Sequence, residues 1–149
     1  MVFQAAGLGV PVLGRGWAQL DPKRWPIELV DDLREHQQDR PTGTRIFCEY
    51  TYGGFIIYHA PGYRVFIDDR CELFGDDFLL RFVWAKDGLN DNLYEHPAEP
   101  FAEWQAQYGS FDLALVETGG GFDQALASMP TAWEMVRGTG TATLYKKVK

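Results

Sequence analysis

Cysteine is scarce in this sequence, and its spacing argues against a metal site. Cys48 and Cys71 are the only two cysteines in 149 residues, and neither belongs to a Cys-x-x-Cys or Cys/His ligand pattern, so a structural zinc site is not expected. Cys48 lies inside a strand-like run. We therefore predict a buried thiol there, with a disulfide to Cys71 as the alternative.

Long apolar runs are missing as well. The longest, residues 55–58 and 78–83, fall far short of the roughly 20 residues of a membrane-spanning helix, so the chain as given is expected to be soluble. Residues 1–13 are apolar but have no basic start and contain Gly and Pro, which makes them a poor signal peptide. We interpret residues 1–20 as an extended lead-in to a single domain over residues 21–149, cut from a longer protein.

Basic residues are outnumbered and form no block. Fourteen Lys and Arg against 21 Asp and Glu give a formal net charge of -7, which repels a phosphate backbone, so no nucleic-acid partner is expected. The apolar fraction of 46%, with 15% aromatic residues, is ample for one packed core.

Strand-like and helix-like segments alternate along the chain, which predicts an α/β fold. Strands are expected over residues 45–50, 64–68, 111–117, 133–137 and 141–147, and helices over residues 24–38, 55–59, 76–86, 98–108 and 122–128, with a polar loop over residues 88–100. Right-handed crossovers favour the order 2-1-3-4-5. The result is a three-layer sandwich around a mostly parallel, Rossmann-like sheet with a C-terminal antiparallel edge hairpin.

This order brings the carboxyl ends of the first and third strands together, where open α/β sheets bind ligands. The turn after the first strand supplies the candidate binding residues Glu49, Tyr50, Tyr52, Gly53 and Gly54. Glycines that open a helix expose backbone N–H groups to an anion, but they also simply permit a tight turn. No G-x-G-x-x-G spacing follows a strand, so neither a dinucleotide nor any other cofactor is expected.

The loop after the second strand supplies the candidates Asp68, Arg70 and Glu72. Asp68 and Asp69 are one possible pair of metal ligands, but adjacent strand residues point to opposite faces and Arg70 neutralises one of them. We favour a structural Asp–Arg pair. A free-standing metal-dependent transferase or hydrolase that uses Asp68, Asp69 and Glu49 stays as the alternative.

Two further patterns bear on catalysis and recognition. Glu49 and Glu117 end neighbouring strands, which fits either an acid–base pair or ordinary carboxylates that face water. The three histidines are scattered and no Ser or Cys elbow accompanies them, so no hydrolase triad is expected.

The aromatic residues around Tyr50 and Tyr52 belong to the core or, if exposed, to a protein-interaction domain.

The segments 45–50, 52–54, 65–68 and 73–76, read together with Arg70, resemble one family. It is the soluble C-terminal region of bacterial multi-pass membrane proteins of the glycosyltransferase type, which depend on polyprenyl-phosphate sugars. The resemblance extends over about residues 20–85, including the helix that leads into this unit. It departs at Thr51, where the family has an acidic residue, and at Tyr52, where it has Trp.

The resemblance implies an accessory, non-catalytic domain on the extracytoplasmic face of a bacterial membrane. Its partners are then the membrane domain of its own parent protein and a glycan or peptide acceptor. Residues 49–53 are also similar to the Trp-Trp-Asp-Tyr-Gly turn with which oligosaccharyltransferase catalytic subunits contact an acceptor peptide.

Overall fold

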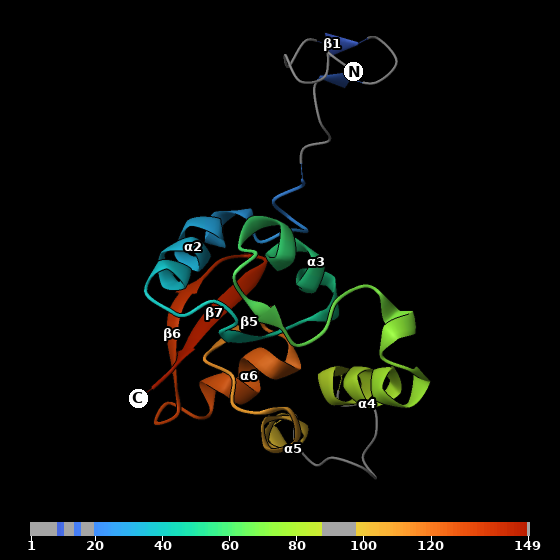
Figure 1. Cartoon of the computed structure of the whole chain (residues 1–149), viewed down its shortest axis with the longest axis vertical. Coiled ribbons are helices and arrows are strands. Elements are labelled where there is room, and N and C mark those ends of the chain that lie inside the picture. The colour runs from blue at the N-terminus through green and yellow to red at the C-terminus, as the bar shows by residue number, and fades with distance from the viewer. Residues whose placement is uncertain (1–8, 11–13, 16–19, 88–97, 149) are drawn as a thin grey trace.

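The computed structural model describes residues 9–10, 14–15, 20–87 and 98–148 (Figure 1). Two short strands, β1 (Gly9–Val10) and β2 (Gly14–Arg15), pair antiparallel. Most of the predicted lead-in over residues 1–20, and most of the loop predicted over residues 88–100, lie outside the described residues.

The helices fall close to the predicted ranges. Pro26 delays the first one, which begins as the 3-10 turn η1 (Ile27–Leu29) and continues as α2 (Val30–Gln38). The later elements are α4 (Asp76–Asp87), α5 (Ala98–Tyr108), α6 (Gly121–Ala127) and the 3-10 turn η2 (Cys71–Leu73). The helices predicted over residues 76–86, 98–108 and 122–128 are thus confirmed to within a residue.

The helix after the first strand differs from its prediction. α3 spans Tyr50–His59 and begins directly after Glu49, so Gly53 and Gly54 lie within the helix and do not form a turn in front of it. A Cβ at Gly53 would lie 2.6 Å from Asp68 Cα and closer still to the Ile67 carbonyl oxygen. Glycine is needed here because the helix packs directly against the backbone of the 67–68 segment.

The main sheet has five strands in the order β4-β3-β5-β7-β6. Their bounds are β3 (Arg45–Cys48), β4 (Arg64–Val65), β5 (Leu113–Glu117), β6 (Trp133–Gly138) and β7 (Ala142–Lys147). β3 pairs parallel with β4 and β5, whereas β7 pairs antiparallel with β5 and β6. The α/β class is confirmed, and the sheet is mixed.

The predicted order of the C-terminal hairpin is wrong, because β7 and not β6 lies beside β5. Residues 142–145 of β7 are buried without interruption, whereas most of β6 after Trp133 is exposed. A strand with both faces covered belongs inside a sheet, and a mostly exposed strand with charged residues, such as β6, belongs at its edge. Glu134 and Arg137 in β6 were the sequence signal for this arrangement.

The predicted strand over residues 64–68 is also too long. Strand pairing ends at Val65, although Phe66 N–H still donates to the Ile46 carbonyl at 3.0 Å. Beyond it the chain turns away, and the Ile67 carbonyl accepts a hydrogen bond from the Cys48 thiol at 3.1 Å. Asp68 therefore belongs to a loop.

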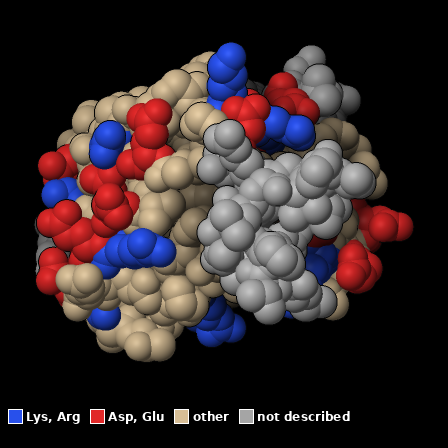
Figure 2. All heavy atoms as spheres, turned by 90° about the horizontal axis from the view of Figure 1, so that it is seen from above, with Lys and Arg blue, Asp and Glu red and all other residues tan. Residues whose placement is uncertain are grey.

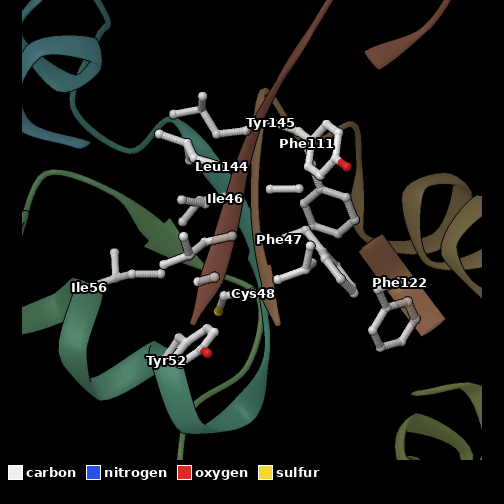
Figure 3. Close-up of a cluster of buried hydrophobic side chains, with 14 of the residues drawn as sticks. Ile46, Phe47, Cys48, Tyr52, Ile56, Phe111, Phe122, Leu144 and Tyr145 are labelled. Atoms are coloured by element: carbon white, nitrogen blue, oxygen red, sulfur yellow. The ribbon is translucent and has the colours of Figure 1, made fainter. Parts of the chain in front are cut away.

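Helices lie on both sides of the sheet, with α2 and α3 on one side and α5 and α6 on the other (Figure 1). The close-up separates the two groups of side chains: Ile46, Tyr52, Ile56 and Leu144 on one side, and Phe47, Phe111 and Phe122 on the other (Figure 3). Phe47 is the centre of the aromatic side, with ring centroids 4.8 Å from Phe101 and 5.0 Å from Phe122. Burial of these rings supplies the main driving force for folding.

Cys48 is buried and Cys71 is half-buried, and both are free thiols. The predicted buried thiol at Cys48 is confirmed, and the alternative disulfide is not present. None of the helices in the described ranges combines the length and the apolar character that crossing a membrane requires.

The two glycines of α3 give a matched test of the close approach. We expect Gly53→Ala to lower the free energy of unfolding by about 2 kcal/mol, because its methyl group meets backbone that has no room to move. At Gly54 the nearest atom is Asp69 Oδ1, 3.3 Å away on a flexible exposed side chain. Gly54→Ala should leave stability unchanged or raise it by about 1 kcal/mol through helix propensity. Urea unfolding of both variants checks this, and equal effects at the two positions would refute it.

Candidate functional site

A cleft of about 350 Å³ lies where the carboxyl ends of β3 and β5 meet. The helices that follow these two strands, α3 and α6, lie on opposite sides of the sheet, and the cleft between such connections is the usual ligand position in α/β folds. The cleft is lined by Lys23, Arg24, Trp25, Thr51, Tyr52, Lys86, Glu117, Thr118, Gly140 and Thr141.

The ammonium group of Lys86, which lines the cleft, lies between the carboxylate of Glu117, which also lines it, and the buried carboxylate of Glu49. Lys86 Nζ, from the last turn of α4, lies 2.9 Å from Glu117 Oε2 and 3.2 Å from Glu49 Oε2. Glu49 and Glu117 come from adjacent parallel strands, as the sequence predicted. Lys86 was not among the predicted site residues.

Glu49 is an unusual carboxylate because only 1% of it is exposed. Its Oε1 accepts a long hydrogen bond of 3.4 Å from the Glu117 backbone N–H, and its Oε2 has no well-aligned hydrogen bond within the described residues. Burial raises the pKa of Glu49, and the neighbouring Lys86 charge opposes that rise. The ion pair with Lys86 is therefore the main compensation for a buried charge.

Lys86 remains a cation in this environment. Burial alone would lower its pKa, but the carboxylates of Glu49 and Glu117 outweigh burial and raise the pKa above its ordinary value. Its ammonium group also lies 5.9 Å from the centroid of the half-buried Tyr50 ring. An ammonium held in this way donates hydrogen bonds and does not accept a proton.

The wall of the cleft is aromatic and hydroxylic. Tyr52 is buried, and its hydroxyl donates to the Thr141 carbonyl at 3.1 Å. Burial raises the pKa of Tyr52 to about 12, so the phenol stays protonated. Trp25 stacks on Phe55 with ring centroids 6.0 Å apart. Thr51 is exposed at the mouth of the cleft, at the first turn of α3.

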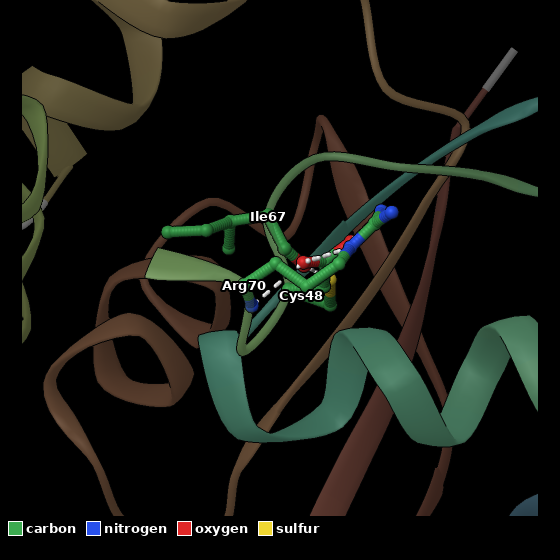
Figure 4. A network of polar contacts seen from close by, with 4 residues as sticks. Cys48, Ile67 and Arg70 are labelled. Carbon is green, nitrogen blue, oxygen red and sulfur yellow. Dashed lines mark hydrogen bonds and ion pairs between the residues drawn. The ribbon is translucent and has the colours of Figure 1, made fainter. Parts of the chain in front are cut away.

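Asp68 and Arg70 form a self-contained ion pair in the loop after β4 (Figure 4). The Asp68 side chain, 2% exposed, accepts from the Arg70 backbone N–H at 2.9 Å and from Arg70 Nε at 3.0 and 3.1 Å. Hydrogen bonding from the Arg70 side chain lowers the pKa of Asp68 despite its burial. The Arg70 side chain is 60% exposed, so one face of the guanidinium is open to solvent.

The same loop carries Asp69, which with Asp68 formed the alternative pair of metal ligands. Asp69 and Glu72 are exposed, and both oxygens of Asp68 already accept hydrogen bonds from Arg70. Within the described ranges no group of three or more His, Cys, Asp or Glu side chains is placed to hold a metal ion.

A larger hollow of about 840 Å³ lies at the other end of the strands, next to the start of β3 and the end of β7. Most of its charged side chains are paired with one another. Arg40 lies 3.8 Å from Asp112, Lys146 lies 3.2 Å from Glu134, and Lys147 donates to the Ser110 hydroxyl at 2.6 Å. The cleft at the β3 and β5 ends is smaller, yet it contains the buried and perturbed groups, so we take it as the candidate site.

The face that carries α2 shows acidic and basic side chains side by side (Figure 2). One such pair joins Arg137 of β6 to Asp32 of α2 at 3.1 Å. The described part of this face has no continuous basic patch.

Comparison of the chain with models of protein families, with curated protein sequences and with solved structures finds no match.

The Asp68–Arg70 pair makes a prediction about acid stability. The pKa of Asp68 is lower in the folded than in the unfolded chain, so the ionised side chain stabilises the fold. This stabilisation is complete when the pH is above the pKa of Asp in the unfolded chain, and it is lost as the pH falls through the pKa of Asp68 in the folded chain. We expect Asp68→Asn to cost about 1 to 2 kcal/mol at about pH 7 and less at about pH 3. Asp69→Asn is the matched control and should have little effect at either pH. Urea unfolding at both pH values measures the difference, and a penalty for Asp68→Asn that does not change with pH would contradict this account.

The Glu49–Lys86 pair also predicts a penalty that depends on pH, although the pKa of Glu49 is raised and that of Asp68 is lowered. Lys86→Met leaves Glu49 buried without its cation, which should cost about 3 kcal/mol at about pH 7. Because the pKa of Glu49 is raised in the folded state, folding favours its protonated form, so the penalty should shrink towards about pH 4. The double variant Glu49→Gln with Lys86→Met should recover part of the loss. A double variant that is no more stable than Lys86→Met at about pH 7 would show that the pair is not coupled.

Proposed function

We propose that the chain is a binding domain of a membrane glycosyltransferase-like protein, without turnover of its own, and that its cleft holds a saccharide acceptor. The observation that supports this best is the lining of the cleft. It combines one ion-paired ammonium, an exposed carboxylate, three threonines and an indole around a space of about 350 Å³.

A sugar presents neighbouring hydroxyl groups that both donate and accept hydrogen bonds. Glu117 accepts, Lys86 donates, and the Thr51 hydroxyl does either, so the cleft matches both requirements. Trp25 supplies an apolar surface at the same site, where the C–H face of a sugar ring would pack. A cleft with few fixed polar groups and an aromatic wall is the general form of a small-molecule site.

The state of the charged groups supports binding in preference to catalysis. Lys86 stays charged between Glu49 and Glu117, which leaves it unsuited to act as a base. Glu49 is buried behind Lys86 and does not line the cleft. Both groups hold Glu117 and the start of α3 in a fixed position, which favours a preorganised binding surface.

The family resemblance of residues 20–85 supplies the proposed setting. On that reading the domain stands on the extracytoplasmic face of a bacterial membrane, and its partner is the membrane domain of the same parent protein. A glycan acceptor fits the cleft better than a peptide, because the described part of the site has no exposed strand edge to pair with an extended chain.

Titration with methyl glycosides of glucose, galactose, mannose and N-acetylglucosamine tests the proposal. We expect at least one of them to shift the backbone amide signals of Thr51, Thr118 and Thr141 in a protein NMR spectrum, with a dissociation constant of about 1 mM or weaker. Thr51→Trp should abolish the shifts, because it fills the mouth of the cleft from an exposed helical position.

Ile57→Trp is the matched control, because Ile57 is exposed on the same helix but does not line the cleft. The Ile57→Trp variant should bind the sugars as the unmodified chain does. Both Trp variants should have the melting temperature of the unmodified chain. Binding that survives Thr51→Trp would place the sugar elsewhere, and the absence of any shift with all four glycosides would rule out the proposal for simple hexoses.

A further inference from the structure

A second hollow, of about 390 Å³, lies at the other end of β3, beside the edge strand β4. Among the described residues that line it, the charged ones are Arg45 and Arg64. The rest of the lining is apolar or aromatic: Val65, Phe66, Leu73, Phe74, Phe78, Tyr108 and Phe111. The described lining therefore combines two cations with an apolar surface and contains no acidic residue.

The two arginines are neighbours on the sheet. Arg45 and Arg64 are register partners across the parallel pair β3–β4, so their side chains leave the same face of the sheet next to each other. Like charges directly opposite each other destabilise a sheet. Neither guanidinium has an ion pair or a hydrogen bond with any described residue. Asp112, which directly precedes β5, donates its backbone N–H to the Arg45 carbonyl at 3.0 Å, but its carboxylate lies 3.8 Å from Arg40.

The guanidinium of Arg45 is held in place by the end of α5. Gly109 follows that helix with φ +90, and its N–H donates to the Gln105 carbonyl at 3.0 Å. A Cβ at Gly109 would lie 2.9 Å from Arg45 Cζ and closer still to one of its terminal nitrogens. Arg45 is therefore packed against the backbone of Gly109 and half-buried, although its guanidinium forms no ion pair within the described residues.

The apolar wall of the hollow is a set of aromatic rings in mutual contact. Phe66 lies 5.6 Å from Phe78 and 5.8 Å from Tyr108 between ring centroids. Leu73, at the rim, is 64% exposed. The wall is thus open to solvent on one side, and its free energy would fall on contact with an apolar ligand.

We infer that this hollow binds an amphipathic anion, a single apolar chain that ends in a carboxylate or phosphate, with the anionic group between Arg45 and Arg64 and the chain on the aromatic wall. Two adjacent guanidinium groups match the paired oxygens of such a group, and the anion removes the repulsion between them. The hollow lies at the opposite end of β3 from the proposed saccharide cleft. The anion site and the saccharide site are therefore tested independently of each other.

The test compares decanoate, decyl phosphate and the neutral decanol, each below its micelle concentration, by isothermal titration calorimetry on the full chain. We expect the two anions to bind at least tenfold more tightly than decanol. The ratio between decanoate and decyl phosphate then distinguishes a carboxylate ligand from a phosphate ligand. Equal affinity for decanol and both anions would overturn the inference.

Arg64→Glu separates a ligand site from a purely structural feature. The new carboxylate beside Arg45 should raise the melting temperature of the free protein, and at the same time it should weaken decanoate binding at least tenfold. Arg64→Gln should weaken binding with little change in stability, because the Arg64 side chain is exposed. Arg24→Gln, in the saccharide cleft, is the control and should leave decanoate affinity unchanged. Unchanged affinity in Arg64→Glu would also overturn the inference.

Discussion

The close approach of α3 to the 67–68 segment is the constraint on which the rest of the structure depends. Because Gly53 has no side chain, the helix starts one residue after β3 and packs against the backbone beside Asp68. This position places Glu49 under the start of the helix, Tyr52 against the Thr141 carbonyl, and the β4 loop beside Cys48. A larger residue would push the helix away from the sheet and open all three contacts together.

A buried charge in this setting has to be compensated from outside its own strand. Glu49 obtains its cation from Lys86 in α4, which is 37 positions further along the chain. The ion pair therefore ties the last turn of α4 to the carboxyl ends of β3 and β5. Such pairs add little net stability compared with apolar packing, but they fix which residues face each other. The geometry of the cleft depends on this choice of partners.

Most helices and strands could be predicted from the sequence, because hydrophobic periodicity and the positions of proline and glycine are local signals. These signals placed α5 at residues 98–108 and brought Glu49 and Glu117 together on neighbouring strands. They did not place β7 inside the sheet, since that depends on which strand of a hairpin is covered on both faces. Lys86, Trp25 and Thr141 were missed as cleft residues for a related reason: they come from separate elements, and only tertiary packing brings them together.

The two outer strands of the sheet also govern how the domain behaves when many copies are crowded together. β4 is only two residues long, and β6 is mostly exposed after Trp133, with a register shift between Met135 and Arg137 that interrupts its pairing. A short strand and a bulged, charged strand are poor templates for an added strand. Both outer strands of this sheet therefore oppose edge-to-edge pairing between neighbouring copies.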